Sequence, residues 1–402
     1  MRTTFTFHTA GQLLFGRYAV RQLPEQLARL NVVRMLIVTD VHLERAGILA
    51  AVREPLAAAG VAVEIFAGGE PEPSIDLADS VIAQARATKP DAILGLGGGS
   101  NMDLAKIAAA VVTHGGAIRD YLGEDKLPGP VLPLVCIPTT SGTGSEVSAA
   151  SVLTDKANHV KVGILSNYLR PRLALVDPEL TLSCPRKVTA DSGIDALTHA
   201  IEAFTAVDNA EFPLPAGERS TYQGRHPFGD MLAERSIALV GKYLVRCCDA
   251  PQDYEAREGM ALAAVLGGMA FSNVGVAIVH ALEYPIGAVL HCSHGAGNGL
   301  LLPYVMRYNM PARRPAFARI AQLLGANTAG LDETAAAEAA ITAVEKLRAA
   351  DRHSESPARH RSRSPTNSPG SPKRRLRSSV VLRVNPRVPT LEDMRGVLEA
   401  AY

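Results

Sequence analysis

The chain has 402 residues, 47% of them hydrophobic, and a formal net charge of +1 at pH 7. Because domains typically hold about 100–200 residues, this length predicts two domains with their own cores. Residues 351–379 contain seven Arg, one Lys and two acidic residues, a net charge of +6, so the remainder of the chain carries −5. Because binding to nucleic acid phosphates needs a basic face, this mildly acidic remainder argues against nucleic acid as a main partner.

Strands and helices are predicted to alternate in the first half of the chain. Apolar, β-branched runs typical of buried strands occupy residues 35–40, 61–66, 92–99 and 133–140. Between them, residues 48–60 and 75–87 place apolar side chains at three- and four-residue spacing, which is typical of helices. This order predicts a parallel, doubly wound α/β sheet, whose ligands bind at the carboxyl ends of the strands.

The second half reads as helix. From residue 189 to 350 nearly every window is rich in Ala and Leu, apart from a polar stretch at 207–227. We therefore expect an α/β domain at residues 1–180 and an all-helical domain at 181–402.

Residues 259–279 are apolar and long enough for a membrane span of about 20 residues. Ser272 and Asn273 interrupt this run, so we expect two buried core helices and no membrane contact.

Three strand-end loops in the first half suit a dinucleotide. Residues 95–106 (GLGGGSNMDLAK) follow a strand and open a helix, so glycine amides and the helix start can approach a phosphate, although a plain tight turn fits equally well. Asp40 ends another strand and can bind an adenosine ribose, which would favour NAD over NADP, or cap the next helix. Residues 137–148 (IPTTSGTGSEVS) can bind pyrophosphate or a nicotinamide amide, or form a solvated turn.

A possible metal site follows in the second half. Asp195 and His199 stand four residues apart on a predicted helix and hence on one face. His280 and His294 lie in a mostly apolar stretch, with His291 as a spare candidate. Singly, each histidine is more often a core or surface residue, but one carboxylate with three imidazoles suits Fe²⁺ or Zn²⁺.

These motifs resemble the iron-containing, or group III, alcohol dehydrogenase family. The likeness runs from about residue 7 through 309, including PTTSGTGSE, GIDALTHAIEAF and HALEYPIGAVLHCSHGAGNGLLLP, and resumes at 385–402. The resemblance implies an N-terminal α/β dinucleotide domain and an all-helical metal-binding domain, the fold shared with dehydroquinate synthase. It also implies a small alcohol or aldehyde substrate, and a homo-oligomer that is a dimer or larger.

The resemblance also carries residue roles onto this chain. The family's metal ligands, for Fe²⁺ or Zn²⁺, fall on Asp195, His199, His280 and His294. Its NAD-contacting positions fall on Asp40, Gly97, Gly98, Gly99, Ser100, Asp103, Thr139, Thr140, Thr143, Gly144 and Lys161. Lys161 would reach the nicotinamide ribose. The implied reaction passes hydride between a primary or secondary alcohol and NAD, with the metal lowering the pKa of the alcohol or polarising the aldehyde.

Two segments depart from the family pattern. Tyr284 stands where many relatives carry a second histidine. A neutral phenol titrates at about 10 and shuttles protons poorly at neutral pH unless its environment shifts its pKa. Tyr284 is therefore a candidate catalytic residue, with a relay through the cofactor ribose and water as the alternative. Residues 208–226 resemble an insertion found in the hydroxyacid-oxoacid transhydrogenase branch and in some bacterial alcohol dehydrogenases, which leaves the preferred substrate length open.

Residues 351–379 form the most unusual segment. Apart from proline, Ala358 and Leu376 are its only aliphatic side chains, so we expect disorder or a loose loop. We interpret it as the product of two compensating frameshifts, which the codons would test; a basic, RS-type interaction tail is the alternative.

Other functions and the compartment follow from the same residues. Three alternative functions stay open: a transhydrogenase that keeps its nicotinamide bound, a non-catalytic NAD-binding remnant and a lyase of the dehydroquinate synthase type. The motifs disfavour the lyase.

The five cysteines form no CxxC pair, and the N-terminus lacks a continuous apolar signal. Both features predict a reducing, cytoplasmic location.

Overall fold

The computed structural model describes residues 3–158, 160–214, 219–290, 292–351 and 380–401. The chain divides into two compact units. One comprises His8–Cys184 and Arg219–Thr221, and the other comprises Met1–Phe7, Pro185–Glu218 and Tyr222–Tyr402. Residues 352–379 of the unusual segment and His291 lie outside the described residues, so the predictions made for them stay untested.

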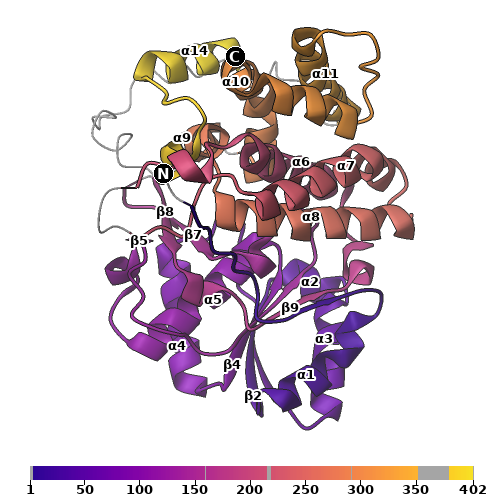
Figure 1. The fold of residues 1–402 in the computed structure, drawn as a ribbon. Helices are drawn as coiled ribbons and strands as arrows, with labels where there is room; N and C mark the ends of the chain where they lie inside the picture. Colours follow the sequence, from indigo (N-terminus) through magenta and orange to yellow (C-terminus); the bar gives the residue numbers. More distant parts are fainter. Residues whose placement is uncertain (1–2, 159, 215–218, 291, 352–379, 402) are drawn as a thin grey trace. The chain divides into compact units, whose positions relative to one another are not determined.

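The first unit is built on a parallel sheet of six strands in the order β1-β9-β6-β4-β2-β3 (Figure 1). Its strands are β1 (Leu13–Phe15), β2 (Arg34–Val38), β3 (Ala62–Phe66), β4 (Ala92–Gly97), β6 (Leu134–Pro138) and β9 (Leu173–Val176). Its helices are α1 (Leu23–Arg29), α2 (Val41–Arg45), α3 (Ile48–Ala58), α4 (Ile75–Thr88) and α5 (Gly99–His114).

The inner strands β2, β4, β6 and β9 are buried on both faces, which is why they form continuous apolar runs in the sequence. Along β2, Leu36 and Val38 join a core with α4 and α5. Met35 and Ile37 join a second core with α1 and α3, because successive side chains of a strand point to opposite faces. The doubly wound prediction is therefore confirmed.

The sequence did not predict every strand. The four predicted runs match β2, β3, β4 and β6, whereas β1 and β9 are only three and four residues long. A second sheet in the order β5-β8-β7 was also missed. Its strands are β5 (Gly123–Glu124), β7 (Ala150–Asp155) and β8 (Val160–Leu165).

The second unit is helical, as predicted (Figure 1). Its helices are α6 (Arg186–Thr205), α7 (Pro227–Asp249), α8 (Tyr254–Val274), α9 (Ile278–Leu290), α10 (His294–Leu323), α11 (Glu333–Asp351), α13 (Val380–Val384) and α14 (Leu391–Ala401). Every residue of α6 from Gly193 onward is buried. Because a helix buried on all sides belongs to a core, the polar side chains on α6 must find partners inside the unit.

The run at residues 259–279 is divided between two helices, α8 and α9, as predicted, but the break lies at residues 275–277 and not at Ser272 and Asn273. Helix α8 continues through both residues to Val274 and is capped by Gly275, whose φ of 121° lies in the region that favours glycine. The Asn273 amide donates to the carbonyl of Met269, which satisfies it within the helix. Among the described helices none alone is long and apolar enough to cross a membrane; α8 and Ile278–Gly287 meet that criterion only as a pair bent by 104°.

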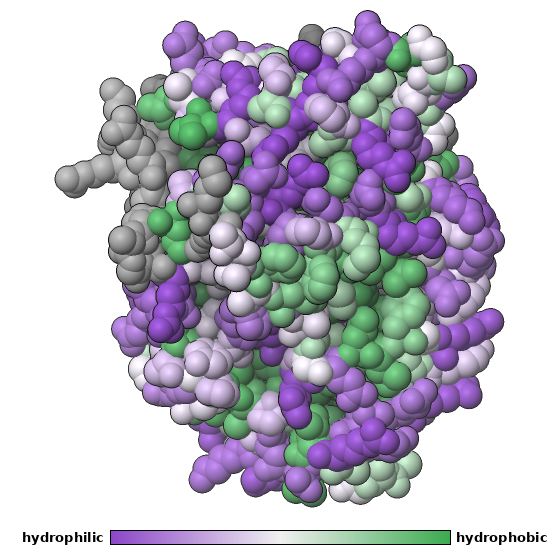
Figure 2. All heavy atoms as spheres, viewed as in Figure 1, coloured by the Kyte–Doolittle hydropathy of each residue, from purple (hydrophilic) through white to green (hydrophobic). Residues whose placement is uncertain are grey.

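The surface mixes polar and apolar side chains. Figure 2 shows hydrophobic residues gathered within a largely hydrophilic face. Among large apolar side chains, Val388 is 89% exposed, and Val33 and Met231 are each 62% exposed. Folded proteins commonly expose single apolar residues, so these three side chains do not by themselves indicate an interface.

Candidate functional site

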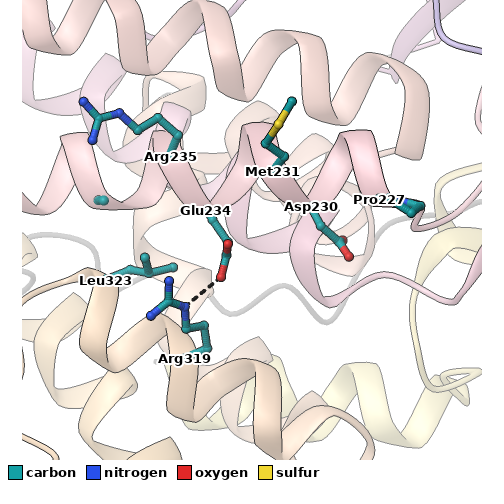
Figure 3. Close-up of a pocket in the computed structure, with 8 residues that line it drawn as sticks. Pro227, Asp230, Met231, Glu234, Arg235, Arg319 and Leu323 are labelled. Atoms are coloured by element: carbon teal, nitrogen blue, oxygen red, sulfur yellow. Dashed lines mark hydrogen bonds and ion pairs between the residues drawn. The ribbon is translucent and has the colours of Figure 1, made fainter.

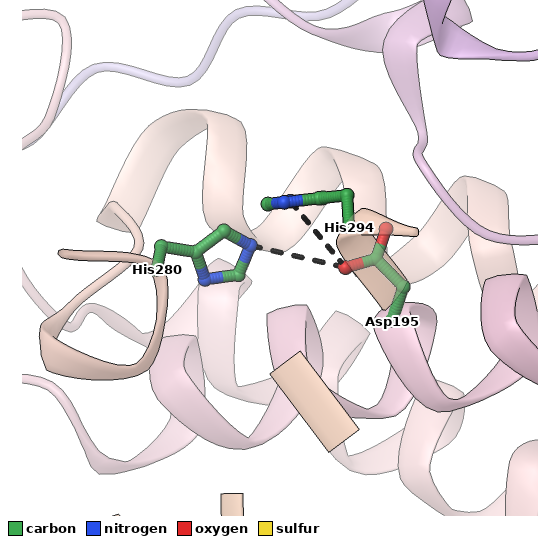
Figure 4. Close-up of side chains that lie close together, drawn as sticks. All are labelled: Asp195, His280 and His294. Atoms are coloured by element: carbon green, nitrogen blue, oxygen red, sulfur yellow. Dashed lines mark ion pairs between the residues drawn. The ribbon is translucent and has the colours of Figure 1, made fainter. Parts of the chain in front are cut away.

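Three predicted ligands come together in the helical unit. Helix α6 supplies Asp195, α9 supplies His280 and α10 supplies His294, and one ligand atom from each lies within 4.8 Å of the others (Figure 4). Asp195 Oδ1 lies 3.9 Å from His280 Nε2 and 3.8 Å from His294 Nε2. Asp195 and His280 are buried, whereas the His294 side chain is 31% exposed.

His199 lies beside this cluster. It follows Asp195 by one helical turn, and its Nε2 is 3.9 Å from Asp195 Oδ1. Its ring stacks on Phe271 at 4.2 Å and on His280 at 4.8 Å. The structure therefore brings the three predicted imidazole ligands to one oxygen of the fourth ligand, Asp195. Asp195, His280 and His294 form the mutually close group.

Two buried glutamates orient the imidazoles. His280 Nδ1 lies 2.6 Å from Glu202 Oε2, and His294 Nδ1 lies 2.5 Å from Glu283 Oε2. A ring nitrogen that donates to a carboxylate leaves the other nitrogen, Nε2, with a lone pair for a cation. Both imidazoles are thus held in the tautomer that metal binding needs.

Asn298 lies between the acceptors. Its Nδ2 is 2.7 Å from Asp195 Oδ1, 3.2 Å from His280 Nε2 and 3.1 Å from His294 Nε2. Among the described residues, no donor reaches its buried Oδ1. Convergence of three acceptors on one point is what a cation site requires, and a carboxylate with imidazole nitrogens suits a borderline divalent ion. The residues therefore fit such an ion.

The charge of Asp195 is also settled by this environment. Burial acts to raise its pKa, but the imidazoles of His199, His294 and His280 and the bond from Asn298 hold that pKa below its ordinary value. The carboxylate is therefore ionised at neutral pH and can bind a cation.

Tyr284 lies near the cluster. Its ring on α9 is 6.1 Å from the His294 ring, with the two planes 22° apart. Burial raises the pKa of the Tyr284 phenol above its ordinary value. A neutral phenol at this position supports the view that it is a poor proton shuttle.

The predicted cofactor loops meet within the α/β unit. Strands β2, β4 and β6 are neighbours, and their carboxyl ends lead to Asp40, to the glycine turn and to residues 139–144. A Cβ on Gly99 would lie 3.0 Å from the Thr143 side chain, and one on Gly98 would lie 3.7 Å from Thr140. Glycine thus lets the turn and the hydroxyl-rich loop approach each other closely.

Asp40 caps a helix, the alternative considered above. Its Oδ1 accepts from the amides of His42 and Leu43 at 2.9 and 3.1 Å, and its Oδ2 accepts from Asn101 Nδ2 at 2.8 Å. A carboxylate offers about four lone-pair sites, so one remains for a ribose hydroxyl. The two roles of Asp40 are compatible.

The other predicted cofactor positions differ in their surroundings. Gly97 has φ 141° and Gly144 has φ 60°, so both turns depend on glycine. Ser100 belongs to the first turn of α5, and Thr139 is buried. Lys161 lies on β8 of the small sheet, where its Nζ is 2.9 Å from Glu72 Oε1.

A surface pocket elsewhere in the helical unit holds no predicted site residue. Its volume is about 550 Å³, and α7 and α10 line it (Figure 3). Glu234 and Arg319 face each other there in an ion pair of 2.7 Å. The chemistry described above therefore lies outside this pocket.

Known proteins are similar to this chain in sequence and fold. Residues 10–178 match the family described as iron-containing alcohol dehydrogenase, and residues 216–402 match its C-terminal family. The chain is 37% identical over 333 residues to the NAD-dependent methanol dehydrogenase of Bacillus methanolicus, covering 83% of each chain. It is 40% identical over 335 residues to long-chain-alcohol dehydrogenase 1 of Geobacillus thermodenitrificans, covering 83% of this chain and 80% of that one. The chain belongs to the iron-containing alcohol dehydrogenase family.

A solved structure agrees with this assignment. A 1,3-propanediol oxidoreductase superimposes with a TM-score of 0.90 and 32% identity, covering 99% of this chain and 100% of that one. Family membership identifies the chain as an alcohol oxidoreductase. The named relatives are alcohol dehydrogenases, which favours a dehydrogenase over a transhydrogenase. The family resemblance and the fold predicted from the motifs are confirmed.

Sequence reasoning missed several polar residues of this alcohol dehydrogenase. Glu202 lies seven residues after Asp195, Glu283 three after His280, and Asn298 four after His294. Residues three, four or seven positions apart lie on the same face of a helix, so each of these spacings indicated a polar residue on the same face as a predicted ligand. Asn101 gave no such signal, because its partner Asp40 lies on another element.

Proposed function

We propose that the chain is a metal- and NAD-dependent alcohol dehydrogenase that interconverts a primary or secondary alcohol with its carbonyl product. The observation that carries this proposal is the position of Asp195 Oδ1, which lies 3.9, 3.9 and 3.8 Å from the Nε2 atoms of His199, His280 and His294. We propose Fe²⁺ as the native metal, with Zn²⁺ as the alternative, because this donor set suits both.

Four side chains would hold the metal, namely Asp195, His199, His280 and His294. When bound, a divalent cation supplies a Lewis acid that lowers the pKa of an alcohol and polarises a carbonyl. The chain's own contribution is to present ionised Asp195 and to fix the imidazoles through Glu202 and Glu283. Tyr284, as a neutral phenol, would line this site without relaying protons.

NAD would bind at the carboxyl ends of the parallel strands. The amides of the glycine turn and the start of α5 would receive the pyrophosphate, because a helix N-terminus carries partial positive charge. Asp40 would bind the adenosine ribose and disfavour NADP. The remaining proposed contacts are Gly97, Gly98, Gly99, Ser100, Asp103, Thr139, Thr140, Thr143, Gly144 and Lys161.

We also propose a cytoplasmic homo-oligomer, with the cofactor domain at residues 1–180 and the metal domain at 181–402. Size-exclusion chromatography with light scattering tests the assembly. A monomer at micromolar concentration would contradict it.

The function is tested by metal reconstitution. The protein is purified anaerobically, stripped, reloaded with Fe²⁺ or Zn²⁺, and assayed for NADH oxidation with short and long aldehydes. We expect turnover that depends on added metal, and an Asp195→Asn variant that still binds NADH but does not turn over. Equal rates with and without metal, or an active Asp195→Asn variant, would contradict the proposal.

A further inference from the structure

Lys106 is a buried cation that none of the roles above uses. It lies on α5, and among the described residues it has the largest of the fully buried side chains. Taking an ammonium group out of water is costly unless hydrogen bonds and charges compensate it. The protein therefore needs a specific set of partners for this side chain.

Those partners all come from one short segment, residues 145–150. Lys106 Nζ lies 2.8 Å from Ser145 Oγ and 2.8 Å from the carbonyl oxygen of Ala150. It also lies 3.0 Å from the hydroxyl and 3.2 Å from the carbonyl oxygen of Ser148. An ammonium has three N–H donors, so this cage of four oxygens satisfies all of them.

Asp103 completes the arrangement one turn earlier on α5. Its Oδ1 accepts from the Ser145 hydroxyl at 2.8 Å, and its Oδ2 accepts from the Val152 amide at 2.9 Å. Ser145 therefore accepts from Lys106 and donates to Asp103, which joins the two opposite charges through one hydroxyl. Helix α5 and the segment 145–152 are bound together by buried, charge-assisted hydrogen bonds, which are stronger than neutral ones.

This connection lies next to the proposed cofactor loop, residues 139–144. Ser145 directly follows that loop, and its amide donates to the Thr143 hydroxyl at 3.3 Å. At the other end of the connection, α5 begins with Gly99, whose position faces Thr143. One ammonium group therefore links the helix that begins one side of the proposed pyrophosphate site to the segment that follows the loop on the other side.

We propose that Lys106 is a positioning residue for the cofactor, which holds residues 139–144 against the start of α5 before NAD arrives. The inference rests on the proposed function. A loop that is already ordered costs less to bind, because its conformational entropy has been lost in folding. Removing the ammonium should therefore weaken the cofactor complex while leaving the metal ligands on α6, α9 and α10 unchanged.

The test compares Lys106→Met with Val111→Ala. Methionine has a similar length but no charge, whereas Val111 is a core residue on the same helix that contacts the apolar cluster. We expect Lys106→Met to raise the dissociation constant of NADH by about 10-fold or more. The KM for NAD should rise similarly, with kcat at saturating NAD and the metal dissociation constant within about threefold of wild type. Val111→Ala should lower Tm without changing NADH affinity.

A second variant covers the case in which Lys106→Met does not fold. Ser148→Ala removes one oxygen from the cage and leaves the charge in place, so a smaller rise in the NADH dissociation constant and in KM is expected. Unchanged NADH affinity in Ser148→Ala and in any folded Lys106→Met would overturn the inference, as would an equal loss in Val111→Ala. Failure of the wild-type protein to bind NADH would instead contradict the proposed function itself.

Discussion

Glu202 holds His280 by a hydrogen bond of 2.6 Å between Oε2 and the ring nitrogen Nδ1. The same carboxylate accepts from the backbone amides of Ala277 and Val279 at 2.8 and 2.7 Å. One buried side chain of α6 thus fixes both the first turn of α9 and the imidazole that α9 carries. The hydrogen bond from His280 to Glu202 therefore fixes the direction of His280 Nε2, the atom proposed to bind the metal.

We predict that Glu202→Gln weakens metal binding by about 10- to 100-fold, the usual cost of losing a partner that orients a ligand. A glutamine must turn its NH₂ toward one of three donors that now face a carboxylate. Competition with a chromophoric chelator measures the affinity. Glu234→Gln, on the surface of α7, is the control and should keep wild-type affinity; the same affinity in Glu202→Gln would show that the carboxylate has no orienting role.

Asp40→Asn should relax the preference for NAD. Asparagine caps a helix as well as aspartate does, so α2 should stay intact. The neutral side chain no longer repels a 2′-phosphate, and we expect the ratio of kcat/KM for NADP to that for NAD to rise by about 10-fold or more. Steady-state kinetics with both cofactors checks this. A constant ratio with unchanged Tm would mean that Asp40 serves only as a cap.

His226 should make the protein less stable in mild acid. Its Nδ1 accepts from the Gly229 amide at 3.1 Å, its ring stacks on Phe5, and burial lowers its pKa to about 4. An unfolded histidine titrates near 6.5. Between these values the unfolded chain binds a proton that the folded chain does not, so the free energy of unfolding falls as the pH is lowered.

The variant His226→Asn separates this effect from other acid-sensitive groups. Asparagine preserves the cap without titrating in this range. The decrease in Tm between pH 7 and pH 4.5 should be smaller in the variant than in the wild type, even if its Tm at pH 7 is lower. Parallel decreases would show that His226 does not contribute.

Gly295→Ala should disrupt the metal cluster through the backbone. A Cβ at Gly295 would lie 2.0 Å from the carbonyl oxygen of Asp191, so α10 must move away from α6. That movement separates His294 from Asp195, and we expect a lower Tm together with weaker metal binding. Gly396→Ala on α14 is the matched control: nothing lies within 4 Å of its Cβ, and alanine should stabilise that helix by about 0.5–1 kcal/mol. Wild-type metal affinity in Gly295→Ala would contradict this account.

The sequence by itself determined the features that depend on neighbouring residues. Buried parallel strands are apolar throughout, so β2, β4 and β6 could be recognised from composition. The four-residue spacing of Asp195 and His199 fixed their common helix face, and the glycine turn announced a close approach of backbone.

Only the tertiary structure decided the features that join distant residues. Strands β1 and β9 pair Leu13 with Ala174, and three or four residues are too few to give a pattern of their own. Glu202 meets His280 across 78 residues, and Asn298 meets Asp195 across 103. Lys106 reads as an ordinary helix residue until folding buries it among the oxygens of residues 145–150. The packing of helices and strands brings such partners together. They are needed because burying a polar side chain without a hydrogen-bond partner costs free energy.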